Sequence, residues 1–308
     1  MSTGTPTARS PIFSVVVPTF DRLESLEQCL RALAAQQLPR ARFEVVVVND
    51  GGASSPRPVV DRFRGQLDIR LHEQANAGPA AARNAGAAAA RGDYVVFTDD
   101  DCRPAPCWLS AIAEMAVDHP VCAVGGRVNN ALGESVYSSA SQQLIEFLYE
   151  YYNLSDTEGR FFITSNLAFP TAGFRAIGGF DATFPLAAAE DRDICDRWRE
   201  AGMTMVYCED AVVDHAHALG FGSYCRQHFN YGRGAYHLHR ARTRRGEAQV
   251  RVEPPLFYSR LVMYPLSRTP PARAAALSAL LFVSQIVYIS GYLLERVAPA
   301  TRVTTLHE

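Results

Sequence analysis

The chain has 308 residues, of which 48% are hydrophobic and 20% are charged, and its formal net charge is -2. This composition predicts a globular protein with a full hydrophobic core and gives no electrostatic reason to expect nucleic acid as a partner. All 30 basic residues are arginines, so no lysine is present to complete a Walker-type phosphate loop. The seven cysteines include no CxxC pair, which indicates reduced thiols in a cytoplasmic protein. Residues 1–11 lack an apolar stretch, so we expect a flexible tail there and no signal peptide.

Apolar runs in the first half of the chain alternate with helical patterns. We expect strands over residues 13–17, ended by Pro18, and over residues 43–48, 67–71 and 94–97. Leucines at positions 23, 26, 30 and 33 have the spacing of one helix face, and the alanine-rich residues 79–90 favour a second helix. Continuous apolar strands connected by helices predict a parallel sheet that is covered on both faces. The first strand leads into Pro18-Thr19-Phe20-Asp21-Arg22 rather than GxGxxG, which argues against a dinucleotide cofactor.

Polar side chains follow three of the predicted strands: Thr19 with Asp21, Asn49 with Asp50, and the triplet Asp99-Asp100-Asp101. Because parallel strands end at the same edge of a sheet, we expect a rim of carboxylates where ligands of α/β proteins bind. In an extended chain, Asp99 and Asp101 would point to one side and Asp100 to the other. Two carboxylates on one side suit Mg²⁺ or Mn²⁺, and the alternative is a solvated acidic turn.

A second acidic cluster, Glu190-Asp191-Arg192-Asp193, precedes apolar residues at positions 194, 195, 198 and 201, which have helical spacing. We therefore expect Glu190 and Asp191 in the first turn of an amphipathic helix that Gly202 ends. The alternative role of these carboxylates is helix capping, together with a favourable interaction with the helix dipole.

Three further segments leave alternatives open. His215 and His217 follow a β-like run and share one face, so His215 is either a metal ligand or a structural histidine. Residues 224–245 are rich in arginine and aromatic residues, and Arg233 either clamps a diphosphate in a mobile lid or lies on a basic surface helix. Residues 274–294 carry no charge and are long enough to span a bilayer. They predict a span, an interfacial helix or a helix buried in an oligomer.

Five segments resemble, in order, the motifs of the family 2 glycosyltransferases, which have the nucleotide-sugar-binding GT-A fold. They are residues 14–22, residues 47–52 (with Asn-Asp-Gly-Gly in place of the usual Asp-Asp-Gly-Ser), residues 76–86, the acidic triplet at the DxD position, and Gly178-Gly179-Phe180-Asp181 followed by Glu190-Asp191. The resemblance extends over residues 13–217. It implies an α/β fold with a mixed, mainly parallel sheet and helices on both faces, followed by a C-terminal helical appendage.

The resemblance also implies roles for individual residues. Asp101, with Asp99 and His215, would hold Mn²⁺ or Mg²⁺, which would stabilise the departing diphosphate. Asp191, beside Glu190, would be the general base that deprotonates an acceptor hydroxyl, in a single displacement with inversion. From the residues alone, Asp50 is alternatively a turn former and Arg83 a solvated helix residue. The nucleotide sugar would contact Pro18, Thr19, Phe20, Asp21, Asp50, Asn76, Gly78, Arg83, Asp99, Asp100 and Arg233.

We therefore expect an inverting, metal-dependent glycosyltransferase that uses a nucleoside-diphosphate sugar, with a UDP-sugar as the first candidate. A nucleotidyltransferase that uses a nucleoside triphosphate and a catalytically silent GT-A relative are the alternatives. The expected division is a nucleotide-sugar half over residues 12–128, an acceptor and base half over 129–220, and a helical region over 221–308. The acceptor would be a glycan, a lipid-linked sugar or a small molecule. A membrane surface or a second copy would meet the helical region, at the inner face of the cytoplasmic membrane in the first case.

Overall fold

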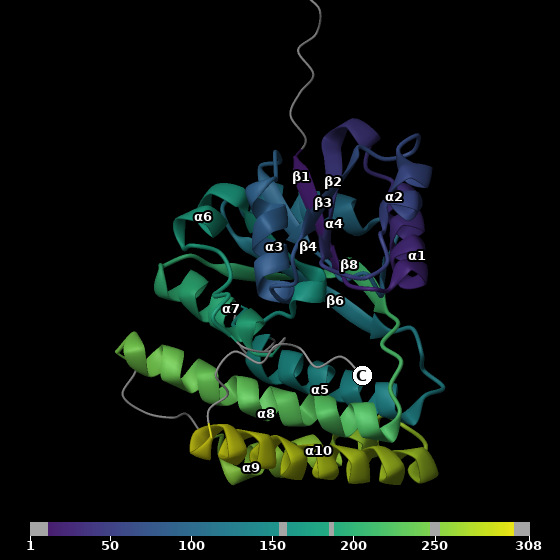
Figure 1. Ribbon diagram of the computed structural model, residues 1–308. Coiled ribbons are helices and arrows are strands. Elements are labelled where there is room, and N and C mark those ends of the chain that lie inside the picture. Colours follow the sequence, from purple (N-terminus) through teal and green to yellow (C-terminus); the bar gives the residue numbers. More distant parts are fainter. Residues whose placement is uncertain (1–11, 154–158, 185–187, 247–252, 299–308) are drawn as a thin grey trace, which may run out of the picture.

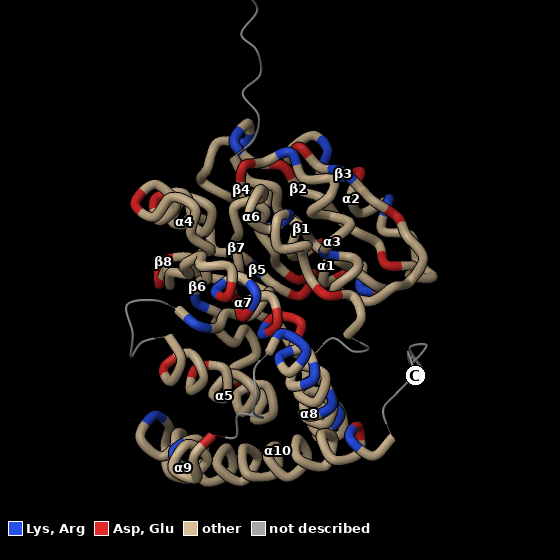
Figure 2. The backbone as a smooth tube through the Cα atoms, turned by 90° about the vertical axis from the view of Figure 1, so that its left-hand side faces the viewer, with Lys and Arg blue, Asp and Glu red and all other residues tan. Residues whose placement is uncertain are grey.

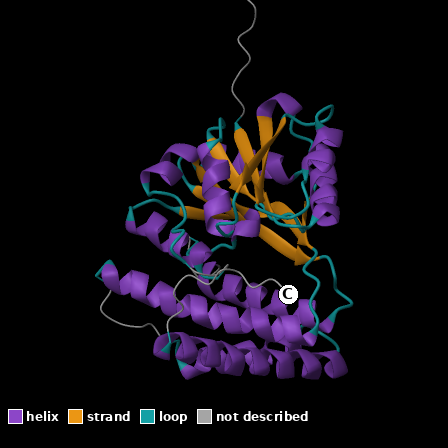
Figure 3. Ribbon diagram, in the orientation of Figure 1, coloured by secondary structure: helices purple, strands orange, loops and turns teal. Residues whose placement is uncertain are grey.

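The computed structural model describes residues 12–153, 159–184, 188–246 and 253–298, so the expected tail at residues 1–11 lies outside the described residues. A layer of strands and short helices lies above a layer of long helices (Figures 1 and 3). The strands form one sheet in the order β3-β2-β1-β4-β7-β6-β8-β5. Its strands are β1 (Phe13–Thr19), β2 (Phe43–Asp50), β3 (Ile69–Gln74), β4 (Tyr94–Phe97), β5 (Cys102–Pro104), β6 (Ala123–Asn130), β7 (Leu167–Pro170) and β8 (Met205–His215).

The sheet is parallel from β3 to β4 and mixed beyond that point. β7 runs antiparallel to both β4 and β6, β6 and β8 are parallel, and β5 is antiparallel to β8. The mixed sheet that the resemblance implied is therefore confirmed. Because β1, β2 and β4 are parallel neighbours, their carboxyl ends lie at one edge, as the sequence predicted.

Side chains that alternate along the central strands fill two cores, one on each face of the sheet. Val15, Val17, Val45 and Val47 pack with residues of α1 (Leu23–Ala34), α2 (Arg57–Phe63) and α4 (Trp108–Asp118). Val16, Val46 and Val48 pack on the opposite face with residues of α3 (Pro79–Ala88), α6 (Thr171–Ala176) and α7 (Glu190–Glu200). Both faces of the sheet are thus covered by helices, as expected for strands that are apolar throughout.

Four predicted strand boundaries are wrong, including the end of β3, which continues to Gln74 and not only to Leu71. β1 does not end before Pro18 but continues to Thr19. The last bond between β1 and β4 runs from the nitrogen of Thr98 to the oxygen of Val16, and β4 ends at Phe97. Pro18 therefore has no strand partner on that side, and its missing N–H costs the sheet no hydrogen bond. β2 continues to Asp50, which is paired with Gln74 of β3. β3 begins at Ile69 rather than Leu67, because the nitrogen of Leu67 still donates to Phe63 at the end of α2.

The lower layer contains α5 (Val136–Asn153), α8 (Phe221–Arg244), α9 (Pro255–Met263) and α10 (Pro271–Val297). Three short 3-10 turns, η1 (Arg40–Arg42), η2 (Thr164–Asn166) and η3 (Tyr264–Ser267), connect elements. A Cβ atom on Gly232 of α8 would overlap the carbonyl oxygen of Tyr288, and one on Gly291 of α10 would overlap that of Phe229. These two glycines therefore allow the backbones of α8 and α10 to touch. α10 also packs on α5. The helical layer therefore contains helices from before and after residue 220, and the predicted domain boundary at that residue stays a prediction.

Candidate functional site

The candidate site lies at the carboxyl ends of β1, β2 and β4, the edge of the sheet that faces the helical layer (Figure 1). The triplet Asp99-Asp100-Asp101 does not continue β4 in extended form, because the nitrogen of Cys102 donates to the oxygen of Asp99 at 3.1 Å and closes a turn. The conditional expectation that Asp99 and Asp101 share one side is therefore not met. Asp100 and Asp101 instead share Arg22, at 2.9 and 2.8 Å, while Asp99 faces Arg83.

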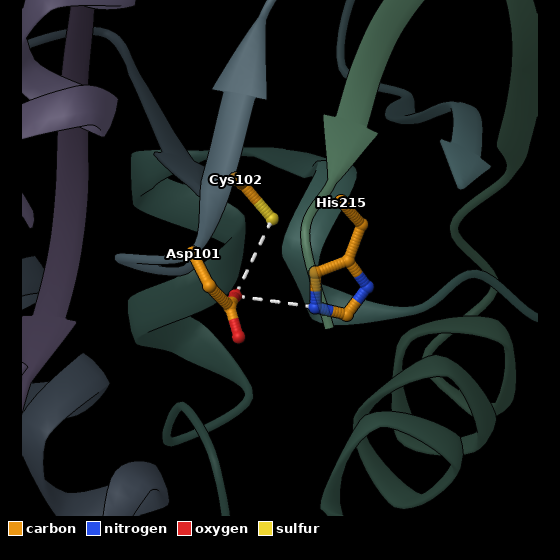
Figure 4. Close-up of side chains that lie close together, drawn as sticks. All are labelled: Asp101, Cys102 and His215. Carbon is orange, nitrogen blue, oxygen red and sulfur yellow. Dashed lines mark hydrogen bonds and ion pairs between the residues drawn. The ribbon is translucent and has the colours of Figure 1, made fainter. Parts of the chain in front are cut away.

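Strand β5 places His215 beside Asp101. β5 pairs antiparallel with β8, with Cys102 opposite His215, and the nitrogen of Ala216 donates to the oxygen of Asp101 at 2.9 Å. Nε2 of His215 consequently lies 3.1 Å from Oδ1 of Asp101, and Sγ of Cys102 lies 3.9 Å from the same oxygen (Figure 4). The three possible ligand atoms lie within 4.8 Å of one another.

The chemistry of these donors fits a hard or borderline divalent cation. Carboxylate oxygen suits Mg²⁺ and Mn²⁺, and imidazole nitrogen suits ions of the transition series. Burial raises the pKa of Cys102 well above its usual value, so the thiol stays protonated and is a poor ligand. Asp101 and His215 are thus the residues of the cluster that fit such an ion, whereas Asp99, the third predicted ligand, is paired with Arg83.

The pKa values of Asp100 and Asp101 are shifted in opposite directions. Burial raises the pKa of Asp100 to about 7, although Arg22 and a 2.7 Å hydrogen bond from Thr19 oppose the shift. Burial also acts to raise the pKa of Asp101, but the hydrogen bond and charge of His215 outweigh it and hold that pKa below its ordinary range. Burial would lower the pKa of His215, but Asp101 overcomes this and raises it. Of Asp100 and Asp101, Asp101 is therefore the one that stays ionised and available as a ligand.

Arg83 joins the triplet to the second acidic cluster. This α3 residue is buried, and its guanidinium lies 2.7 Å from Asp99 and 3.1 Å from Glu190 in the first turn of α7. The alternative of a solvated Arg83 is therefore wrong. Burial and the charge of Asp191 raise the pKa of Glu190 to about 7 against the effect of Arg83, and burial raises the pKa of Asp191.

Glu190 and Asp191 lie in the first turn of α7 and not at its N-cap, which is Ala189 with a left-handed backbone at φ 70° and no side-chain hydrogen bond. The alternative of helix capping still holds in part for Asp191, because its carboxyl accepts a hydrogen bond from a backbone nitrogen of the first turn. Glu190 is committed to Arg83, and Oδ1 of Asp191 accepts a hydrogen bond from the nitrogen of Arg192 at 2.8 Å. The helix itself, with Ile194, Cys195 and Trp198 buried and Gly202 after its end at φ 77°, matches the prediction.

At the ends of β1 and β2, carboxylates hold the loops that follow the strands. Asp50 accepts hydrogen bonds from the side chain of Gln74 and from the backbone nitrogens of Ala77 and Gly78, at 2.8 to 2.9 Å. It is therefore a strand residue that fixes the loop containing Asn76 and Gly78, and not a turn former. Asp21 accepts from the nitrogen of Ser54 at 2.8 Å and joins the turn after β1 to the loop after β2. Pro18 and Thr19 end β1, and Phe20 follows them at the same edge of the sheet.

One predicted residue lies elsewhere, and three others were not assigned a role from the sequence. Nε of Arg233 lies 2.6 Å from Oε2 of the buried Glu295, so Arg233 joins α8 to α10 and does not serve a mobile lid. Arg22, which contacts Asp100 and Asp101, is recognisable in the sequence only as part of the first motif. Nε2 of Gln227 donates to the hydroxyl of Tyr231 at 2.5 Å. Burial, with smaller contributions from the charges of Asp191, Glu190 and Asp99, raises the pKa of Tyr231 to about 12. α8 is joined to α7 by the pair of Arg242 with Asp196 at 2.7 Å.

The mixed sheet, with a carboxylate–imidazole cluster at its edge and a second acidic pair across Arg83, belongs to the GT-A fold class. Within that class the chain belongs to glycosyl transferase family 2, whose model matches residues 14–178, more than half of the chain. The expected fold class and the expected transferase activity are thereby confirmed.

Similar proteins support this assignment. The glycosyltransferase AglE of Haloferax volcanii is 27% identical over 234 residues, which are 74% of this chain and 74% of AglE. The pre-mycofactocin glycosyltransferase of Mycobacterium tuberculosis is 30% identical over 232 residues, which are 72% of this chain and 46% of that protein. This chain therefore spans about half the length of the second relative.

Solved structures show the same fold. The mannosyltransferase PcManGT from Pyrobaculum calidifontis, in complex with GDP-Man and Mn²⁺, superposes with a TM-score of 0.66 at 18% identity, covering 96% of this chain and 90% of that chain. S. aureus TarS in complex with UDP-GlcNAc superposes with a TM-score of 0.55 at 20% identity, covering 91% of this chain and 89% of that chain.

Proposed function

We propose that the chain is an inverting, metal-dependent glycosyltransferase that moves a sugar from a nucleoside-diphosphate sugar to an acceptor hydroxyl. The observation that carries the proposal is the position of Arg83, which contacts Asp99 of the triplet at 2.7 Å and Glu190 of the second cluster at 3.1 Å. One buried guanidinium thus connects the two acidic clusters, so that a donor at the triplet and a base on α7 belong to a single site.

Asp101 and His215 would hold Mn²⁺ or Mg²⁺, which when bound supplies a Lewis acid for the departing diphosphate. The complex of the P. calidifontis relative with GDP-Man and Mn²⁺ supports this part of the proposal. His215 must be neutral to act as a ligand, and Asp101 raises its pKa, so cation binding should release a proton. Arg22 shares Asp101 with the cation site, and its side chain is 52% exposed, so it competes with the cation for this carboxylate.

Asp191 is the proposed general base, which accepts the proton of the acceptor hydroxyl. Burial raises its pKa, and a base becomes more effective as its pKa approaches the working pH. Glu190, in the same helical turn, is held by Arg83 and orients the start of α7. One base opposite one leaving group corresponds to a single displacement, and the anomeric configuration is inverted.

A cavity of about 330 Å³ between β6, α5 and η3 is the proposed acceptor side of the site. Tyrosine, amide and carboxylate side chains line it, among them Tyr149, Tyr207, Asn129 and Glu146, and these groups can bind a polyhydroxylated molecule by ring contact and hydrogen bonds. Burial raises the pKa of Tyr149, and the charge of Asp191 adds to this shift, which is consistent with a cavity near the base.

The donor is proposed to be a UDP-sugar, since TarS was solved with UDP-GlcNAc, while the GDP-Man complex of the archaeal relative makes GDP-sugars the comparison. The test is incubation with Mn²⁺ and a panel of UDP- and GDP-sugars, with release of nucleoside diphosphate as the readout. Pyrophosphate release from nucleoside triphosphates would instead support a nucleotidyltransferase. Donor binding without release, under every acceptor tested, would support a silent relative.

We further propose that the enzyme acts in the cytoplasm. All seven cysteines are free thiols in the structure, and five of them are buried. An oxidising compartment would expose Cys107 and Cys225 to unwanted pairing, so a reducing compartment suits this chain better. Labelling of thiols in intact cells and in lysates would test the assignment, since cytoplasmic thiols react with an impermeant reagent only after lysis.

A further inference from the structure

The helices at the outer side of the helical layer, α9 and α10, expose large apolar side chains (Figure 1). On α10, Phe282, Ile286, Ile289 and Leu293 follow one another at helical spacing and are each 51% to 56% exposed. Leu256 and Met263 of α9 and Leu266 of η3 are 55% to 64% exposed on the neighbouring segment. We call these seven residues the outer apolar face. A monomer in water gains nothing from exposing such a set of large side chains, and patches of this kind mark interaction surfaces.

Helix α10 is the one helix among the described residues that is long and apolar enough to cross a membrane. Its most apolar 18 residues have a mean hydropathy of 1.8. Its inner side, however, is committed to the protein. Leu277, Leu281 and Ser284 are buried, and the glycine contacts bring its backbone against that of α8. Glu295 is buried and paired with Arg233 and His237 of α8. Because leaving α8 would strip these contacts and leave a charge unpaired, only the outer side of α10 is available to a partner.

Apart from the buried Glu295, the charges on α9, η3 and α10 themselves have one sign, although Arg268 is paired with Glu150 of α5 at 2.9 Å. Between residues 255 and 297 the chain has four arginines, at positions 260, 268, 273 and 296, and its one acidic residue is the buried Glu295. Figure 2 shows α9 and α10 as largely uncharged, with blue segments and a few red ones near their ends. A symmetric contact with a second copy would set this face against itself and bring arginines together without exposed carboxylates on either helix. An anionic lipid surface, by contrast, complements both the apolar side chains and the arginines.

We propose that the outer apolar face lies on an anionic bilayer, with α9 and α10 in the plane of the membrane and α10 not crossing it. At 1.5 Å per residue, the 27 residues of α10 are about 40 Å long, enough for an extended line of contact with the lipid surface. The apolar side chains enter the boundary between headgroups and acyl chains, and the arginines meet the lipid phosphates. The sheet and the candidate site remain on the aqueous side, above the helical layer.

The experiment is flotation of the full chain with vesicles of phosphatidylcholine containing phosphatidylglycerol, compared with vesicles of phosphatidylcholine alone. We expect the protein to float with the anionic vesicles, at least about tenfold less with the neutral ones, and to leave the membrane in alkaline carbonate, because it does not span. The double variant Ile286→Glu with Leu293→Glu should lose binding by about tenfold or more, since it places two charges in the apolar stripe.

The matched control is Val117→Glu on α4, where the wild-type side chain is 79% exposed and lies outside the outer apolar face. It should bind vesicles like the wild type, and thermal unfolding should show that both variants are folded. Retention in the membrane after carbonate would overturn the proposal in favour of a span. A protein that ignores vesicles and forms a dimer that the double variant dissociates would overturn it in favour of contact between copies.

Discussion

Five carboxyl groups in the candidate site are balanced by few positive charges. Arg22 contacts Asp100 and Asp101, and Arg83 contacts Asp99 and Glu190. Because these groups are largely buried, each unpaired charge is costly, and the site relieves the cost by raising the pKa of Asp100 and Glu190 to about 7. A divalent cation beside Asp101 would add the positive charge that this arrangement lacks.

We expect Asp101→Ala to abolish transfer and Mn²⁺-dependent nucleotide binding, because it removes the ionised oxygen ligand from a site with few others. His215→Ala should weaken the same binding, since its Nε2 lies 3.1 Å from Asp101. Calorimetric titration with nucleotide, with and without Mn²⁺, is the measurement. Asp61→Ala, an exposed position on α2, is the control. Full activity of Asp101→Ala in the presence of a chelator would disprove the metal assignment.

We expect Asp191→Asn to bind donor almost normally but to lower turnover by about 10²-fold or more, the usual loss when a general base is removed. Glu200→Gln at the end of the same helix should retain wild-type turnover, because this residue pairs with Arg245 far along α7 from the base. Steady-state kinetics with separate measurement of donor affinity is the test. Donor binding that collapses together with turnover would make Asp191 a structural or donor-side residue.

At the scale of elements, the contact between α8 and α10 determines where the helical layer sits. The glycines at its centre permit backbone contact, and the pairs of Glu295 with Arg233 and His237 fix the register. α8 then contacts α7 through Arg242 and Asp196, and α10 presents the outer apolar face. The prediction that Arg233 belongs to a mobile lid is wrong, because this packing holds α8 against α10.

We expect Gly232→Ala to destabilise the protein by roughly 1–3 kcal/mol, because its Cβ atom would overlap the carbonyl oxygen of Tyr288 and force the helices apart. Gly222→Ala is the matched control on the same helix, where a Cβ atom would meet no neighbour within 4 Å. This control should be neutral or gain up to about 1 kcal/mol from helix propensity. Denaturant unfolding of both variants is the measurement, and equal stabilities would contradict the packing described for α8 and α10.

At the scale of the whole molecule, the candidate site draws on several elements. The sheet edge supplies the triplet, α3 supplies Arg83, α7 supplies Glu190 and Asp191, and α8 packs on α7 through Arg242 and Asp196. The same arrangement buries carboxyl groups that would titrate near pH 4 in an unfolded chain. Stability of the whole fold is therefore linked to the protonation of the site.

We expect the free energy of unfolding to fall with rising pH relative to that of Glu190→Gln. Because burial raises the pKa of Glu190 from 4.5 to about 7, the folded chain binds more protons than the unfolded chain between these values. Stability is thus fully present below pH 4.5 and declines as pH rises towards 7. The variant lacks this titration, so the free energy of unfolding of Glu190→Gln minus that of the wild type should increase by roughly 1–3 kcal/mol from pH 5 to pH 8. Unfolding in chelator and without donor is the measurement, and a constant difference would contradict the raised pKa.

The sequence by itself determined the elements whose causes are local. The apolar runs specified β1, β2 and β4, leucine spacing specified α1, and the acidic start and apolar stripe specified α7, because burial of alternate or helically spaced side chains depends on nearby residues. The order of the motifs was also sufficient for the family. Strand ends were less predictable: β1 passes through Pro18 only because β4 is shorter than β1, which is a property of the neighbouring strand.

Only the tertiary structure decided which charges meet. Arg22 and Arg83 are separated in the chain from the carboxylates they contact, and the pairing of Asp101 with His215 requires β5 to lie against β8. In the sequence, Arg233 is one of several arginines in a basic helical segment. In the structure it is paired with Glu295, because two glycines bring α8 and α10 together. The uncharged C-terminal segment has one buried and one exposed side for the same reason. Long-range packing, which residue spacing does not encode, places these groups.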